Sequence, residues 1–95
     1  MVALGTTGRF IYYVYILKSQ ITGKLYKGSC QDLKIRVKNH NAGKVKSTKS
    51  GKPWKLIYYE AFENKTDALR EELFLKSGKG YERVKYLFSK PGGVA

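Results

Sequence analysis

Three segments rich in aromatic and β-branched residues predict the strands of a small sheet. Residues 10–17 are apolar at successive positions, which is typical of a central strand that is covered on both faces. Residues 24–29 alternate and follow a turn at residues 20–23, so the first two segments should form a hairpin. Residues 54–62 predict a third strand.

A helix is expected directly after the hairpin. Ser29, with Asp32 three positions on, resembles a capping box, and the helix should span about residues 31–41. Gly43 should end it. The lysine-rich segment at residues 43–53 contains many small residues and is expected to be a mobile loop.

Two further helices are expected after the third strand. Asn64 should cap a helix that runs to about residue 76, where Gly78 and Gly80 break it. Residues 81–89 predict a short third helix. The order β-β-α-β-α-α indicates an α+β fold in which helices flank a small sheet.

The length of 95 residues supports a single domain, expected over residues 10–89 between a flexible lead at 1–9 and a flexible tail at 90–95. The longest apolar run is too short to cross a bilayer, which needs about 20 residues. A single cysteine, Cys30, excludes an internal disulfide and a site of paired thiols. These features favour a reducing, cytoplasmic location.

The charge distribution points to a polyanionic partner. Nineteen Lys and Arg face seven Asp and Glu, a net charge of +12, and no acid occurs between Leu33 and Tyr59. Nucleic acid is favoured over an anionic membrane because no basic amphipathic helix with a large apolar face is evident. The residues expected to hold nucleic acid are Lys27, Lys44, Lys46, Lys49, Lys52 and Trp54.

Two polar residues break the apolar pattern of the first helix. Leu33 and Val37 define its packing face, and the helical rotation puts Arg36 and His40 on or beside that face, four positions apart. A helix that served packing alone would not carry a guanidinium and an imidazole there.

The second helix carries a carboxylate in its apolar arc. Glu72 projects into the middle of this arc, where it must be paired, hydrogen-bonded or bound to a metal. A structural ion pair with Arg36 is the plain alternative to a functional role. The arc consists of Ala68, Leu69, Leu73 and Leu75.

Two tyrosines are candidate functional residues in addition to Arg36, His40 and Glu72. Tyr15 and Tyr26 should lie roughly opposite each other across the hairpin and point to one face, either as core aromatics or as proton-transfer groups. One sheet face could then carry these phenols with Arg36, His40 and Glu72, a set that suits metal-assisted phosphodiester hydrolysis.

The ordered motifs resemble the GIY-YIG nuclease family. Residues 13–15, Tyr-Val-Tyr, and 26–28, Tyr-Lys-Gly, resemble the two halves of its signature, with Tyr13 in place of the first glycine. The likeness runs from residue 11 to about 88 and includes the Ala-Leu-Arg-Glu-Glu stretch at 68–72. Lys27 departs from the usual apolar or small residue, and strand alternation predicts that it points away from the site.

This resemblance implies a three-stranded antiparallel sheet and a Mg²⁺- or Mn²⁺-dependent endonuclease, similar to the N-terminal domain of the excinuclease C component. It implies that Tyr15 and Tyr26 are the signature tyrosines, one of them the general base or its relay. It implies that Arg36 is the catalytic arginine, His40 a proton-transfer residue and Glu72 the metal ligand. Gly28 would mark a close backbone approach.

Three functions fit these observations. The first is an endonuclease acting on DNA, structure-guided or weakly sequence-selective and linked to repair or recombination. The second is a nucleic-acid-binding module with little cleavage, and the third is a nuclease subunit that needs a partner protein. The sequence does not separate DNA from RNA, or a monomer from a homodimer.

Overall fold

The computed structural model describes residues 10–88 and has the predicted element order. Strands β1 (Tyr12–Ser19), β2 (Leu25–Cys30) and β3 (Trp54–Phe62) form one antiparallel sheet in the order β2-β1-β3. The predicted α+β fold with a three-stranded antiparallel sheet is confirmed. The flexible ends expected at 1–9 and 90–95 lie outside the described residues.

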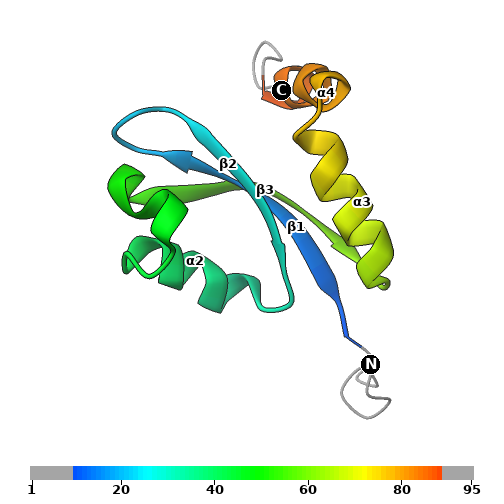
Figure 1. Ribbon diagram of the computed structural model, residues 1–95, viewed down its shortest axis with the longest axis horizontal. Helices are drawn as coiled ribbons and strands as arrows, with labels where there is room; N and C mark the ends of the chain where they lie inside the picture. The colour runs from blue at the N-terminus through cyan, green and yellow to red at the C-terminus, as the bar shows by residue number, and fades with distance from the viewer. Residues whose placement is uncertain (1–9, 89–95) are drawn as a thin grey trace.

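Helices cover both faces of the sheet (Figure 1). The helix α2 (Leu33–Asn41) and the 3₁₀ helix η1 (Lys46–Gly51) lie on one side, which we call the α2 face. The helices α3 (Lys65–Leu75) and α4 (Gly78–Phe88) lie on the other, the α3 face. In the part of the chain described, no helix is long and apolar enough to cross a membrane.

The central strand β1 serves both layers, which explains its unbroken apolar run. Val14 and Ile16 are fully buried against Ala68 and Leu75 on the α3 face. The alternate residues Tyr15 and Leu17 are equally buried on the α2 face. Residues 14–17 of the middle strand are therefore buried on both faces.

The hairpin register corrects one expectation and confirms another. Tyr15 pairs with Gly28, and Tyr26 pairs with Leu17, so the two tyrosines are diagonal neighbours on one face rather than direct partners. Lys27 pairs with Ile16 and so points away from Tyr15, as alternation predicted, but toward the α3 face.

The start of α2 differs from the expected capping box. Asp32 is the N-cap, and its Oδ1 accepts a hydrogen bond from the Ile35 backbone N–H at 3.0 Å. Ser29 remains in β2, with its side chain free for another partner. The predicted helix end is confirmed, because Gly43 has a φ of 76° just after the C-cap Ala42.

The lysine-rich segment is not the mobile loop that was expected. Residues 46–51 form η1, within which Thr48 and Gly51 are buried. Trp54 Nε1 donates to the Thr48 carbonyl at 2.7 Å, and Ser19 Oγ donates to the Gly51 carbonyl at 2.6 Å. These bonds fix the segment to the sheet, and its lysines project outward.

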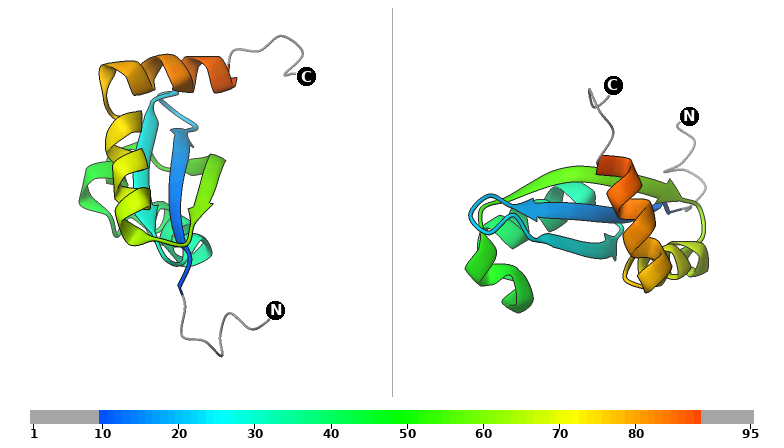
Figure 2. Two further views of the ribbon diagram at one scale, coloured as in Figure 1. Left: turned by 90° about the vertical axis from the view of Figure 1, so that its right-hand side faces the viewer. Right: turned by 90° about the horizontal axis from the view of Figure 1, so that it is seen from above.

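The two glycines after α3 do not act as plain helix breakers. Helix α4 begins at Gly78, three residues before the predicted start, and Gly80 is buried inside it. A Cβ on Gly80 would lie 1.8 Å from the Phe74 carbonyl oxygen, so the absence of a side chain lets α4 approach the end of α3. Helix α4 then runs crosswise over the end of the sheet (Figure 2).

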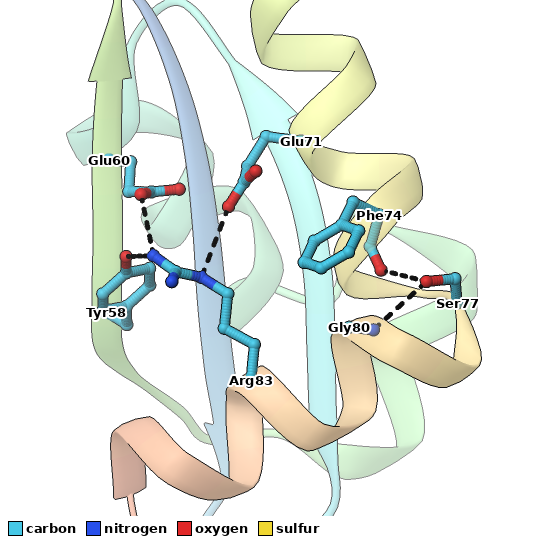
Figure 3. A network of polar contacts seen from close by, with 7 residues as sticks. All are labelled: Tyr58, Glu60, Glu71, Phe74, Ser77, Gly80 and Arg83. Atoms are coloured by element: carbon cyan, nitrogen blue, oxygen red, sulfur yellow. Dashed lines mark hydrogen bonds and ion pairs between the residues drawn. The ribbon is translucent and has the colours of Figure 1, made fainter.

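Arg83 connects α4 to β3 and α3 through ion pairs. Its guanidinium lies 3.4 Å from Glu60 Oε2 on β3 and 3.8 Å from Glu71 Oε2 on α3 (Figure 3). Burial, with the adjacent Glu60 carboxylate, raises the pKa of Glu71, and Arg83 opposes this shift. Glu71 is half-buried.

Candidate active site

The Tyr15 hydroxyl is the centre of a buried polar cluster on the α2 face. Its oxygen accepts a hydrogen bond from Arg36 Nε at 3.2 Å and lies 2.9 Å from His40 Nε2. The side chain is fully buried. Burial raises the pKa of Tyr15 to about 12, although the neighbouring Arg36 opposes the shift. Tyr15 is therefore a protonated phenol near neutral pH.

The direction of the hydrogen bonds through His40 follows from its partners. Burial, with the nearby Arg36 charge, lowers the pKa of His40, so the imidazole is neutral. Thr48 Oγ1 donates to the Val45 carbonyl and lies 2.7 Å from His40 Nδ1. Tyr15 therefore donates to Nε2, while Nδ1–H donates to Thr48. His40 is fully buried and has no open nitrogen.

Tyr26 is the more accessible of the two signature tyrosines. Its ring packs 5.0 Å from that of His40 and 6.3 Å from that of Tyr15. The side chain is half-buried, and its hydroxyl makes no hydrogen bond to the residues described. Because this oxygen is not buried either, it faces solvent. The hydroxyl can meet a water or a substrate atom directly.

Gly28 leaves space for the side chain of Tyr15. A Cβ at this position would lie 2.6 Å from the Tyr15 hydroxyl and 3.2 Å from a ring carbon of Tyr26. The Tyr15 side chain thus lies across the backbone of β2, which only a glycine allows. The close approach suggested by the sequence has this physical basis.

Glu72 lies on α3 and reaches the sheet from the opposite face. Its Oε1 accepts from Ser29 Oγ at 2.6 Å, and its Oε2 lies 2.7 Å from Lys76 Nζ. Burial alone would raise the pKa of Glu72, but the hydrogen bonds from Lys76 and Ser29, with the charge of Arg36, lower it overall. The carboxylate is ionised at neutral pH.

The expectation that all five groups share one sheet face is therefore wrong. Tyr15, Tyr26, Arg36 and His40 lie on the α2 face, whereas Glu72 lies on the α3 face. The two parts are adjacent at β2, which is an edge strand of the sheet. The charge of Arg36 reaches Glu72 strongly enough to affect its pKa.

The apolar arc of α3 also differs from the expected one. Ala68 and Leu75 are buried, and Glu72 lies between them at helical spacing. Leu69 and Leu73 are 42% and 69% exposed and so face solvent. Glu72 was predicted correctly as the polar group on the packing side, although two of its apolar neighbours were not.

The structural ion pair between Arg36 and Glu72 does not form. Among the described residues Arg36 bonds to Tyr15 through Nε, and Glu72 pairs with Lys76. The terminal nitrogens of Arg36 make no hydrogen bond within this part of the chain, and the side chain is half-buried. They can therefore bind an anionic oxygen.

The carboxylate of Glu72 fits a divalent cation of the magnesium type. Its side chain is 18% exposed, so one edge reaches solvent. No group of three or more His, Cys, Asp or Glu side chains gathers within residues 10–88, so the protein would supply at most two such ligands. Mg²⁺ commonly keeps several waters and takes one or two carboxylates with substrate phosphates. Lys76 would have to release Oε2.

The residues expected to hold nucleic acid separate into two groups. The four lysines of the 43–53 segment are exposed, which leaves their predicted role open. Trp54 is only 9% exposed and its Nε1 donates to the Thr48 carbonyl, so it packs in the core and leaves little surface for base stacking. Tyr13 packs edge-on against Tyr59.

Three residues that contact the candidate site had no assigned role in the sequence. Thr48 fixes His40, while Ser29 and Lys76 hold Glu72. The i, i+4 spacing of Glu72 and Lys76 was a visible signal. Thr48 lies 8 residues from His40, and Ser29 lies 43 residues from Glu72; no local pattern indicates either contact.

Comparison with known proteins identifies relatives of this chain. The chain is 42% identical over 88 residues to a UPF0213 protein of Pediococcus acidilactici, covering 90% of this chain and 85% of that protein. It is 36% identical over 77 residues to a UPF0213 protein of Staphylococcus haemolyticus, covering 80% and 93%.

A solved structure and a family model extend the comparison. The solution NMR structure of a UPF0213 protein from Bacillus halodurans aligns with a TM-score of 0.51 at 35% identity, covering 81% of this chain and 84% of that one. The GIY-YIG catalytic domain model matches residues 11–85. The chain therefore belongs to the GIY-YIG nuclease family.

Proposed function

We propose that this protein is a metal-dependent endonuclease that hydrolyses phosphodiester bonds in DNA. The observation that carries the proposal is the meeting at β2 of two parts: the Tyr15–Arg36–His40 cluster and the ionised carboxylate of Glu72. An anion-binding guanidinium, an accessible phenol and a carboxylate are the groups that this reaction needs.

The role proposed for each residue follows from the solvent exposure of its polar atoms. Arg36 binds the scissile phosphate through its terminal nitrogens, because its Nε is held by Tyr15. Tyr26 handles the proton of the attacking water, since its hydroxyl faces solvent. Tyr15 and His40 are positioning residues, because both are fully buried and bonded to each other.

Glu72 would hold the cation, with Ser29 fixing the orientation of its carboxylate. When bound, Mg²⁺ or Mn²⁺ supplies positive charge to the phosphate oxygens and lowers the pKa of water. Arg36 supplies a second positive charge from the α2 face. The lowered pKa of Glu72 keeps it competent as a ligand at neutral pH.

The decisive experiment is a cleavage assay with metal controls. Purified protein is incubated with branched, flapped, single-stranded and duplex DNA, and with matched RNA, in Mg²⁺, Mn²⁺ or EDTA. We expect metal-dependent cleavage that Glu72→Ala lowers by at least about a hundredfold, since a required charge-stabilising group is lost. Binding in EDTA should persist.

A matched control lies one turn earlier on α3. Asp67 is an exposed carboxylate paired only with Arg70, and Asp67→Asn should leave cleavage within about twofold. Equal activity in wild type and Glu72→Ala would reveal a contaminating nuclease and contradict the proposal. Binding without cleavage in every metal would favour the binding-module function, or a subunit that needs its partner protein.

A further inference from the structure

A groove on the α3 face separates the hairpin from α4. Its volume is about 550 Å³. One wall comes from the beginning of β2 and the other from one side of α4, which lies crosswise at this end of the sheet (Figure 2). The walls carry Lys24, Leu25, Lys27, Tyr81, Lys85 and Phe88.

Every charged residue that lines the groove is a lysine. Lys24, Lys27 and Lys85 contribute ammonium groups, and no carboxylate lies among the lining residues. Within residues 10–88 none of these three lysines forms an ion pair with an acid. Since the whole chain already carries +12, three uncompensated lysines around one groove favour a polyanionic occupant.

An open aromatic ring accompanies these lysines. Tyr81 is 58% exposed, and the Lys85 ammonium lies 5.6 Å from its ring centre. Phe88, in contrast, packs edge-on against Tyr58 at 6.1 Å and completes the core side of the groove. The Tyr81 ring makes no aromatic contact with the residues described, so a base can stack on the ring face that Lys85 does not cover.

The groove leads directly to the candidate metal ligand. Lys27 and Ser29 lie on the same face of β2, two residues apart, which corresponds to about 7 Å along a strand. Ser29 bonds to Glu72, and Lys76 extends from the same carboxylate toward the start of α4. A nucleic-acid strand lying in the groove would pass Lys27 and arrive at Glu72.

We propose that this groove binds a single-stranded segment of the nucleic-acid substrate, with Lys24 and Lys85 on phosphates and Tyr81 against a base. A single strand fits better than a duplex because bases within a duplex are already stacked and offer no face to Tyr81. The inference rests on the proposed function in one respect: that the bound strand runs toward Glu72. It assigns substrate binding to the α4 side rather than to the lysines of η1.

The test measures binding separately from cleavage. The full chain carrying Glu72→Ala is titrated in EDTA against a labelled oligothymidine of about 12 nucleotides and against a blunt duplex, by fluorescence anisotropy over a range of salt. The groove variant is Lys24→Gln/Lys85→Gln. The control, Lys34→Gln/Lys38→Gln, removes the same charge from exposed positions on α2. Lys27 is left intact because it adjoins Ser29.

We expect the groove variant to weaken single-strand binding about tenfold and to reduce the salt slope by about 0.7 for each phosphate that is no longer neutralised. The α2 control should change binding less than about threefold. Tyr81→Ala should weaken single-strand binding about fivefold or more, with Tyr81→Phe close to wild type and duplex binding unaffected.

Equal losses in the two lysine pairs, or unchanged single-strand binding in Tyr81→Ala, would overturn the inference. Circular dichroism and thermal unfolding of each variant establish that the fold is intact before binding is compared. The outcome is independent of catalysis: a protein that binds through this groove and never cleaves DNA would sustain the inference and contradict the proposed function.

Discussion

The hydroxyl of Tyr15 on β1 belongs to a chain of hydrogen bonds that links β1 to α2 and η1. It accepts from Arg36 and donates to His40, which in turn bonds to Thr48. Each of these groups is buried or half-buried, and each polar atom that joins them has a partner. The cluster is therefore rigid, and it orients Arg36 toward the edge of the sheet.

Gly28 is the residue whose smallness makes this cluster fit. We expect Gly28→Ala to lower the free energy of unfolding by about 1–3 kcal/mol, because the new methyl group forces the Tyr15 ring out of place. Arg36 loses its orienting bond at the same time, so cleavage should fall at least about tenfold. Urea unfolding and the cleavage assay measure the two effects.

Gly78→Ala is the matched control for this change. A Cβ at Gly78 would meet no atom within 4 Å, and the position opens a helix, where alanine is favourable. Its free energy of unfolding should stay equal or rise slightly. Equal stability of the two variants would mean that Tyr15 does not depend on Gly28.

At the scale of elements, α4 is attached by a mixture of apolar and charged contacts. Val84 packs into the core cluster of the α3 face, and Gly80 allows the close approach to α3. Arg83 then lies between the carboxylates of Glu60 and Glu71 (Figure 3). Because α4 forms one wall of the groove, its attachment also shapes the surface next to Glu72.

Removing the Arg83 charge should loosen α4. We expect Arg83→Met to lower the free energy of unfolding by about 1 kcal/mol, because two half-buried carboxylates are left facing each other without a cation. Adding Glu71→Gln should restore part of the loss, since it removes one of the opposed charges. Urea unfolding near pH 7 measures both.

Arg70→Met provides the comparison for Arg83. Arg70 pairs with Asp67 on the surface of α3, where its side chain is 74% exposed. Such a pair contributes little, and the substitution should change stability by less than about 0.5 kcal/mol. A loss as large as that of Arg83→Met would show that general surface charge, not the attachment of α4, sets the effect.

At the scale of the whole molecule, the protonation of His40 should make stability depend on pH between about pH 5.5 and 7.5. His40 is the only histidine in the chain, and burial and Arg36 lower its pKa in the folded state. Unfolded chains bind a proton at this residue near about pH 6.5, whereas the folded protein does so only at lower pH. Stability should therefore fall as the pH falls below about 6.5.

The slope of this loss is limited to about 1.4 kcal/mol per pH unit, since one proton is involved. Urea unfolding at several pH values measures it, and His40→Gln should be less stable at about pH 7 yet insensitive to pH in this range. Glu72, whose folded pKa is lowered, contributes stability that is lost only below about pH 4.5, so the two effects do not overlap. A flat wild-type profile over this range would contradict the role of His40.

Much of the molecule could be predicted from local pattern. The strand and helix order follows from runs of β-branched and aromatic residues and from helix caps, because these signals act over a few residues. Arg36, His40 and Glu72 could be singled out because each is a polar group at an apolar position of its helix. The excess and clustering of lysine and arginine favour nucleic acid as the partner on their own.

Only the tertiary structure decided how these groups meet. The hairpin register offset Tyr15 from Tyr26, and the helix order placed Glu72 on the face opposite Arg36. Long-range contacts order the expected loop as η1 and bury Trp54. Leu69 and Leu73, in contrast, have no covering partner and are exposed in the part of the chain described. Periodicity determines which side of an element is apolar, but the partner that covers that side, and hence burial and pKa, depends on residues distant in the chain.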